Sequence, residues 1–242
     1  MSRTLTAVVL GASGSVGGAL IDALLRSNAF STIVTLVRRT QPAQVALARA
    51  SGVALREALV PAMTPEALEG ATEQALRVLE GAVVGLSVLG VGAGTAKLTL
   101  DAHRAVDVAL NAAFARALAA SGRVKHLAFM SAVGADASAA ATGSGAAGMP
   151  RYARVKGEAE AAVRGAGLEV VSIFRPAMII GSQHTPWLLE KVLPLFSFVT
   201  PAKYKSITVA EIADAMTATS LRTPERSAVY HYPEMIALRA PP

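Results

Sequence analysis

The stretch LTAVVLGASGSVGG, residues 5–18, decides the fold. Its apolar run ends at Leu10 and passes through glycines spaced three apart into an apolar-periodic helical pattern. A buried strand that turns through glycines into a helix is typical of the first unit of a parallel α/β sheet. The alternation continues, and we expect strands at residues 5–10, 32–37, 52–59, 83–89, 124–130 and 169–174, with helices at 16–26, 65–70, 98–120 and 150–164. The chain is therefore expected to form a doubly wound parallel sheet.

The glycine spacing predicts a Rossmann-like dinucleotide-binding loop. Gly11 permits a tight turn, Gly14 lets the backbone approach a pyrophosphate, and Gly17 lets the helix pack close to the strand. Free N–H groups at the start of the helix favour a negative charge. An ordinary glycine-rich turn is the alternative. We expect the cofactor to bind at Gly11, Ser13, Gly14, Ser15, Val16 and Gly17.

The end of the second strand predicts which dinucleotide binds. An acidic residue usually stands there when the ligand is NAD(H), where it bonds the ribose 2′-hydroxyl. Here the chain has Arg38 and Arg39, and there is no acid between Ser31 and Gln41. Two guanidinium groups can grip a 2′-phosphate with charge-assisted bonds. We therefore expect NADP(H) to be preferred over NAD(H), the alternative being a solvated arginine pair.

Ser131, Tyr152 and Lys156 form the candidate catalytic set. Ser131 ends the fifth expected strand, and the other two lie four residues apart at the start of the next helix, where they share a face. A neighbouring ammonium favours the phenolate, so Tyr152 can exchange a proton with a carbonyl or alcohol oxygen. The alternative is a surface tyrosine and lysine at helical spacing.

These motifs together resemble the short-chain dehydrogenase/reductase superfamily, within it the atypical NAD(P)H-binding branch of the Tat-interacting-protein type. The likeness lies in four stretches, Leu10–Gly17, Phe30–Arg39, Lys125–Asp136 and Tyr152–Glu160, with Phe174-Arg175-Pro176 after the sixth strand. It implies Arg38 or Arg39 near the adenosine phosphate, Gly90 near the cofactor, Lys156 on the nicotinamide ribose and Pro176 beside the nicotinamide.

The sequence departs from the common pattern of that superfamily at three places. Leu59-Val60-Pro61 stands where an aspartate often contacts the adenine, and Asp107 stands where many relatives carry an asparagine on the fourth helix. Ser131 and Tyr152 are also separated by a long segment, of which Gly134–Gly148 is expected to form a mobile loop.

Composition limits the other classes of function. The 242 residues are 52% hydrophobic and 17% charged, enough to bury a large core. There is no cysteine, which excludes disulfides and cysteine nucleophiles and is compatible with the cytoplasm, where we expect the protein. The formal net charge is +6, but the basic residues are scattered, so no nucleic-acid partner is expected. No uncharged run is long enough to predict a membrane span.

Other chemistries have weaker support. The four histidines show no metal-ligand spacing, so no metal is expected. No nucleophile elbow is present, which argues against a hydrolase. His184 lies beside Trp187 in the expected substrate lid, and Trp187, Phe196 and Phe198 line an apolar pocket or a subunit contact, or else pack in the core.

We interpret residues 1–242 as one domain in which 177–242 supply a small substrate-side cap. This tail contains an amphipathic segment at Pro186–Phe198, a helix at Val209–Leu221 with Thr208 as its N-cap, and a last strand at Ala228–Tyr232. The expected function is an NADP(H)-dependent oxidoreductase acting on a small carbonyl or alcohol. The alternatives are a non-catalytic NADPH sensor and, on the pI alone, a nucleic-acid binder. The helical stretch Leu98–Ala120 could support a homodimer.

Overall fold

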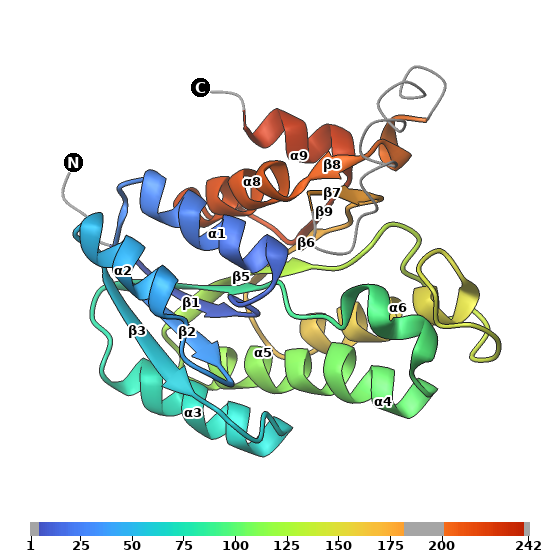
Figure 1. Cartoon of the computed structure of the whole chain (residues 1–242), viewed down its shortest axis with the longest axis horizontal. Coiled ribbons are helices and arrows are strands. Elements are labelled where there is room, and N and C mark those ends of the chain that lie inside the picture. The colour runs from blue at the N-terminus through green and yellow to red at the C-terminus, as the bar shows by residue number, and fades with distance from the viewer. Residues whose placement is uncertain (1–4, 182–200, 240–242) are drawn as a thin grey trace.

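A computed structural model of the protein describes residues 5–181 and 201–239 (Figure 1). Its centre is a seven-stranded sheet in which each neighbouring pair of strands is parallel. The strand order is β3-β2-β1-β4-β5-β6-β9. β2 and β3 are added on one side of β1 and the later strands on its other side, so the topological switch point lies between β1 and β4. The doubly wound, Rossmann-like fold expected from the sequence is confirmed. The carboxyl ends of all seven strands lie at one edge, which is where such sheets bind ligands.

The strands are short and mostly buried. Both neighbours of β1 pair with it residue by residue, Val8 lying opposite Val34 in β2 and Gly85 in β4. The bounds are Leu5–Leu10 for β1, Phe30–Val37 for β2, Ala54–Leu59 for β3, Ala82–Ser87 for β4, Val124–Met130 for β5, Val170–Phe174 for β6 and Ala228–Tyr230 for β9. The expected strands at 5–10 and 124–130 match the observed bounds.

Helices cover both faces of the sheet. In Figure 1, α1, α2, α8 and α9 lie above the sheet and α3, α4, α5 and α6 lie below it. The bounds are Ser15–Arg26 for α1, Pro42–Ala50 for α2, Pro65–Arg77 for α3, Leu100–Arg104 for α4, Asn111–Ala120 for α5, Pro150–Arg164 for α6, Val209–Leu221 for α8 and Tyr232–Leu238 for α9. Each face buries its own apolar cluster against the helices that cover it.

Some helices differ from the sequence expectation. The helix expected at 65–70 continues to Arg77, and two helices were not expected at all, α2 and α9. The stretch expected to be one helix at 98–120 is divided into α4, a π-helical turn at Ala105–Leu110 and α5, and a 3-10 turn at Gly92–Lys97 precedes it. The residues between β5 and α6 contain turns but no helix or strand.

The described part of the C-terminal tail belongs to the main layers. β9 pairs with β6, and α8 packs on α1, with Ile212 and Met216 in the same apolar cluster as Leu20. A second, two-stranded sheet joins β7, Ile179–Ile180, to β8, Ile207–Thr208. The segment expected at 186–198 lies outside the described residues, so the cap at 177–242 stays a prediction. None of the described helices is both long and apolar enough to cross a membrane.

Candidate active site

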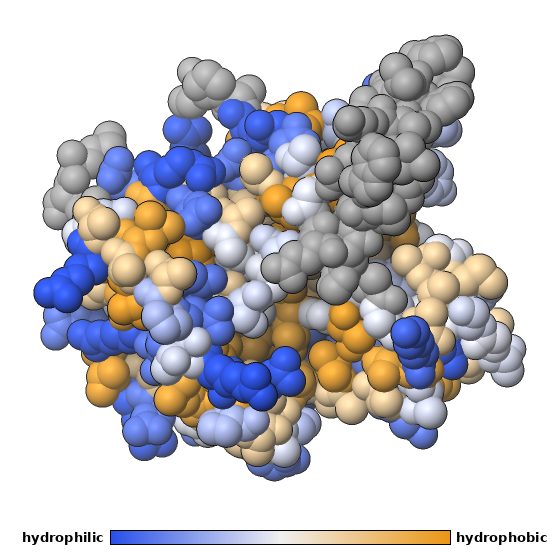
Figure 2. Space-filling view, viewed as in Figure 1, coloured by the Kyte–Doolittle hydropathy of each residue, from blue (hydrophilic) through white to orange (hydrophobic). Residues whose placement is uncertain are grey.

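All the predicted site residues lie at the carboxyl edge of the sheet. Because the strands are parallel, the loops that follow them emerge at the same edge. Gly11 follows β1, Arg38 follows β2, Gly90 lies beyond β4, Ser131 follows β5 and Pro176 lies beyond β6. Tyr152 and Lys156 come from the first turns of α6. In the space-filling view, hydrophobic and hydrophilic residues are interspersed over the face shown (Figure 2).

The glycine loop is a tight turn that leads into α1. Gly11 has a φ of +91°, and a Cβ there would lie 2.7 Å from the backbone nitrogen of Leu89. The Gly14 N–H donates to the Gly11 carbonyl at 3.2 Å, which closes the turn. Both the conformation and the close approach of β4's loop therefore require a glycine at position 11.

Gly14 and Gly17 serve different purposes in this loop. A Cβ on Gly17 would collide with the carbonyl oxygen of Gly11 and with the backbone of Ala12, so this glycine lets α1 pack on the loop itself. A Cβ on Gly14 would meet only the Gly11 oxygen, at 3.6 Å, and Gly14 is exposed. The space in front of Gly14 is therefore open to a ligand, as a pyrophosphate site requires.

The start of α1 favours an anion. Gly14 is its N-cap and makes no side-chain cap bond, and its first turn contains no acidic residue. The positive end of the helix dipole is thus not compensated by a carboxylate in the first turn. Ser13, Ser15 and Val16 frame this end, with Ser13 exposed and Val16 buried. These residues fit the diphosphate of a dinucleotide.

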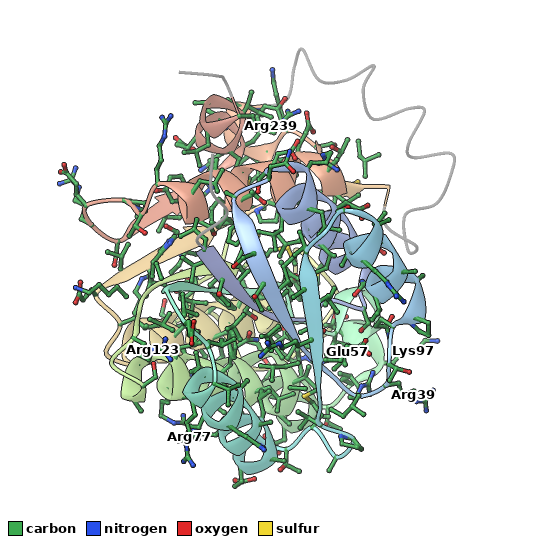
Figure 3. The ribbon with its side chains drawn as sticks, turned by 90° about the vertical axis from the view of Figure 1, so that its left-hand side faces the viewer. Arg39, Glu57, Arg77, Lys97, Arg123 and Arg239 are labelled. Carbon is green, nitrogen blue, oxygen red and sulfur yellow. The ribbon has the colours of Figure 1, made fainter. Side chains whose placement is uncertain are left out.

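Arg38 and Arg39 directly follow β2, and both are exposed. Neither guanidinium has a hydrogen-bond or ion-pair partner among residues 5–181 and 201–239. Figure 3 shows Arg39 at the edge of the molecule, with its side chain directed away from the ribbon. The following loop is held from β3, where the carboxylate of Glu57 accepts from the Gln41 N–H at 2.6 Å. Two arginines are therefore available on a loop that is anchored.

Gln44 connects α2 to the glycine loop and was not expected from the sequence. Its side-chain amide donates to the Ala12 carbonyl at 2.7 Å. This bond joins the glycine loop to the helix that directly follows the loop with Arg38 and Arg39. Since α2 itself was missed from the sequence, no sequence signal pointed to this contact.

Ser131 and Pro176 lie at the ends of adjacent strands. The Ser131 N–H donates to the Phe174 carbonyl at 2.7 Å, and Pro176 accepts from the Val133 N–H at 2.9 Å. The Ser131 hydroxyl is buried and has no hydrogen-bond partner in the described part of the chain. An unpaired buried hydroxyl at this edge is an available donor for a ligand oxygen.

Tyr152 and Lys156 face one another on α6. The Lys156 ammonium lies 5.7 Å from the centre of the Tyr152 ring. The structure thus brings together the two residues that the sequence pairs, but no hydrogen bond joins Ser131 to Tyr152 among the described contacts. The phenol is half-buried, whereas the lysine is 6% exposed.

α6 is fixed to its surroundings on two sides. Gly157 packs against the loop after β5, where a Cβ would collide with the backbone of Asp136 and Ala137. On the other side, the buried Glu160 carboxylate accepts two bonds of 2.7 Å from Arg175, which follows β6. A bidentate, charge-assisted pair of this kind fixes direction as well as distance. The helix is therefore rigidly placed over the ends of β5 and β6.

Asp107 is the site residue that the sequence did not assign. Its Oδ1 accepts from the Lys156 ammonium at 2.5 Å, and its Oδ2 accepts from the Val91 N–H at 3.0 Å. Asp107 lies in the π-helical turn between α4 and α5, a local widening that is frequent at functional sites. The sequence offers one signal for Asp107, because many members of the superfamily that the chain resembles carry an asparagine there. The spacing of residues along the chain does not indicate that its partner is Lys156.

Burial and charge oppose one another in this pair. Burial disfavours the charge of Lys156, but the nearby phenol of Tyr152 and the carboxylate of Asp107 outweigh it and raise the pKa of Lys156 to about 12. Burial would likewise raise the pKa of Asp107, but the Lys156 charge, with His103 close by, lowers it to about 2. Both groups therefore remain charged at neutral pH.

His103 completes the surroundings of Asp107. Its Nε2 lies 3.7 Å from the Asp107 Oδ2, and its ring centre lies 5.8 Å from that of Tyr152. The histidine is fully buried, and neither ring nitrogen has a hydrogen-bond partner within the described residues. His184, Trp187, Phe196 and Phe198, which the sequence places in a lid or pocket, lie outside the described residues.

Solved structures show the same fold. A 3-oxoacyl-[acyl-carrier protein] reductase from Brucella melitensis, in complex with NAD, matches with a TM-score of 0.74 at 15% identity, over 98% of this chain and 99% of the other. L-sorbose reductase from Gluconobacter frateurii, complexed with NADPH and L-sorbose, gives a TM-score of 0.66 at 16% identity over 96% of both chains. Triphenylmethane reductase from Citrobacter sp. gives 0.61 at 20% identity, over 93% and 68%.

Sequence comparison gives the family. A search of curated proteins found no significant match. A family model, however, matches from the first glycine of the loop to the residue after α8, at residues 11–222. This span includes the glycine loop, the arginines, Ser131 and the α6 pair, and it covers most of the chain. The fold, the open glycine loop and this match agree, and the chain belongs to the NAD(P)H-binding family.

Proposed function

We propose that the protein is an NADP(H)-dependent oxidoreductase of the short-chain dehydrogenase/reductase type that acts on a small carbonyl or alcohol substrate. One observation carries the proposal. A single edge of the sheet holds a glycine loop at the start of α1, a buried Ser131 hydroxyl with no partner among the described residues, and Tyr152 with Lys156 on an anchored helix. A hydride-transferring cofactor and the Tyr152 proton could therefore act on the carbon and the oxygen of one substrate carbonyl group.

The preference for NADP(H) rests on charge. Arg38 and Arg39 are exposed, unpaired among the described residues, and directly follow β2. The carboxylate nearest to them on β3, Glu57, is already used by the Gln41 N–H. A 2′-phosphate would gain charge-assisted bonds from the two guanidinium groups, whereas a 2′-hydroxyl would find no free carboxylate on β2's loop.

The roles of the three catalytic residues follow from their chemistry. When bound, the nicotinamide supplies a hydride to the substrate carbon. Tyr152 donates its phenolic proton to the substrate oxygen in the direction of reduction and takes it back in the direction of oxidation. Ser131 donates a hydrogen bond to the same oxygen, and the positive charge of Lys156 stabilises the phenolate that Tyr152 leaves behind.

The cofactor part of the proposal is tested by calorimetric titration with NADPH and, separately, with NADH. We expect the wild-type protein to bind NADPH more tightly. The Arg38→Ala/Arg39→Ala variant should weaken NADPH at least tenfold, about 1.4 kcal/mol, with little effect on NADH. Equal weakening of both would remove the assignment of the 2′-phosphate. Arg49→Ala, which removes an exposed arginine at the other end of α2, is the matched control.

The catalytic part is tested with Tyr152→Phe. A panel of small aldehydes, ketones and sugars is screened for NADPH oxidation by the wild-type protein, and the variant is assayed on any substrate found. Turnover should fall by at least about 100-fold, the range of general acid–base catalysis, while the Kd for NADPH stays unchanged. Tight NADPH binding without turnover on any substrate would instead support the non-catalytic sensor.

A further inference from the structure

The Lys156 ammonium has a dedicated partner that the assigned catalytic set does not include. Asp107 comes from the π-helical turn before α5, 49 residues away in sequence, and accepts from Nζ at 2.5 Å. Asp107 is 1% exposed and Lys156 6% exposed, so both charges are removed from water. A buried charge pair is costly to build unless its geometry is well supported. Such a pair therefore needs an explanation beyond stability.

Three contacts hold the pair in one position. The Val91 N–H donates to the second oxygen of Asp107, and His103 closes the far side of the carboxylate at 3.7 Å. Gly90 lies against both partners, since a Cβ on this residue would be 3.2 Å from Asp107 Oδ1 and 3.2 Å from Lys156 Nζ. The loop after β4, the π-helical turn and α6 thus meet at this ammonium.

The ion pair with Asp107 uses only part of the hydrogen-bonding capacity of the Lys156 ammonium. An ammonium has three N–H donors, and in the described part of the chain only Asp107 accepts from it. The other charged or titratable groups around it are the Tyr152 phenol, the His103 imidazole and the Glu160 carboxylate, and Glu160 is taken up by Arg175 and Arg164. Two donors therefore remain for a ligand.

We propose that Asp107 is a positioning residue for Lys156, holding its ammonium against Gly90 so that the two remaining N–H donors serve the nicotinamide ribose and the Tyr152 oxygen. The ribose contact rests on the proposed function, whereas the ion pair does not. The arrangement also keeps the lysine charged despite its burial, because a buried ammonium without a counter-ion loses its proton more readily. Asp107 acts through Lys156 and touches no reacting atom.

The first measurement is made on the wild-type protein without cofactor. The chain has six lysines, so selective ¹³Cε-lysine labelling gives a small set of NMR signals that can be followed with pH, with Lys156 assigned by Lys156→Arg. Burial alone would lower the midpoint of Lys156 below its ordinary value of 10.5, whereas the Tyr152 phenol and the Asp107 carboxylate, which also accepts from the ammonium, raise it. We expect no titration of Lys156 up to pH 10.5. A midpoint below that value would overturn the proposal.

The second measurement compares Asp107→Asn with a matched control. The amide keeps the shape and removes the charge, so burial is no longer opposed by a carboxylate at the ammonium, and we expect the midpoint of Lys156 to fall by about 4 pH units, to about 8. Glu158→Gln removes a carboxylate from α6 that pairs with Arg104 and Arg154 instead, so it should leave the midpoint of Lys156 unchanged. Equal midpoints in wild type and Asp107→Asn would contradict the proposal.

NADPH titration at about pH 6 and about pH 9 connects the pair to the cofactor. Asp107→Asn should weaken NADPH at least tenfold more at the higher pH, where Lys156 loses its charge, and Glu158→Gln should not. A pH-independent affinity in Asp107→Asn would refute the positioning role while leaving the proposed function intact. If the wild-type protein binds no NADPH but Lys156 remains charged to pH 10.5, the proposed function fails and the ion pair stands.

Discussion

Single glycines in the first loop separate stability from cofactor binding. A Cβ on Gly14 meets only one atom, at 3.6 Å, and the residue has an extended backbone with φ −80° that alanine also adopts. Gly14→Ala should therefore change the free energy of unfolding by less than about 1 kcal/mol. The same methyl group would occupy the space assigned to the pyrophosphate, so the Kd for NADPH should rise at least about tenfold. Urea unfolding and calorimetry measure the two effects.

Gly17 and Gly18 provide the matched comparison. Gly17→Ala should destabilise the protein by about 1–3 kcal/mol because its methyl group collides with the loop backbone. Gly18 has nothing within 4 Å of an added Cβ and lies in α1, so Gly18→Ala should stabilise by about 0.5–1 kcal/mol and leave NADPH affinity alone. A loss of stability in Gly14→Ala as large as in Gly17→Ala would contradict the assignment.

His126 makes stability depend on pH. The residue is 1% exposed, its Nε2 lies 2.9 Å from the Ser172 hydroxyl, and burial lowers its pKa from 6.5 to about 4. As the pH falls below 6.5, His126 binds a proton in the unfolded chain but stays neutral in the folded chain until the pH approaches 4. Stability is therefore lost between about pH 6.5 and pH 4, by up to about 3 kcal/mol. Urea unfolding across this range should show a shallower loss in His126→Gln than in the wild type; parallel curves would refute the assignment.

At the residue scale, local patterns are readable and tertiary pairs are not. The spacing of Tyr152 and Lys156 predicts a shared face because both lie on one helix, and the structure confirms it. The pairing of Lys156 with Asp107 joins two helices that are far apart in sequence, so no periodicity encodes it. Asp107 is noticeable only as a departure from the asparagine of its relatives.

Among the elements, α8 has the clearest sequence-encoded start. Thr208 Oγ1 accepts from the Glu211 N–H at 3.1 Å, and the Glu211 carboxylate accepts from the Thr208 N–H at 2.9 Å. This capping box satisfies two groups that the helix itself leaves unpaired. Thr208→Ala should cost about 1 kcal/mol of unfolding free energy, measured by urea denaturation. Thr223→Ala, an exposed threonine beyond the end of α8, should cost much less.

The strands with a strong apolar signal were predicted well, and the exposed helix α2 was not. β1 and β5 are buried at nearly every position, and their bounds follow from the apolar runs. α2 buries only Ala48, so it has no apolar stripe by which a helical period could be recognised. The π-helical turn was not predicted from the sequence for another reason. It carries Asp107, whose contact with Lys156 on α6 is a tertiary contact and not a local preference.

For the whole molecule, the C-terminal tail is the part whose expected position and observed packing have to be compared. The sequence predicts a cap over the ligand edge, and that prediction concerns in part residues outside the described ranges. The described elements of the tail belong to the main fold: β9 pairs with β6 in the sheet, and α8 packs on α1. Ile212, Met216 and Met235 are fully buried in the cluster that also holds Leu20 and Leu24.

Truncation after Pro176 tests whether the tail is separable. Burial of Ile212, Met216 and Met235 contributes about 2 kcal/mol each, a sum comparable with the total stability of a small domain, about 5–15 kcal/mol. The shortened chain should therefore fail to show cooperative thermal unfolding and should bind the dye ANS through the uncovered face of α1. A chain that ends at Arg239 keeps every described element, so we expect it to unfold cooperatively, like the full chain measured beside it. If the chain of residues 1–176 instead unfolds cooperatively and binds NADPH, the tail is a cap on an independent dinucleotide-binding domain, and the packing of α8 on α1 contributes little to the fold.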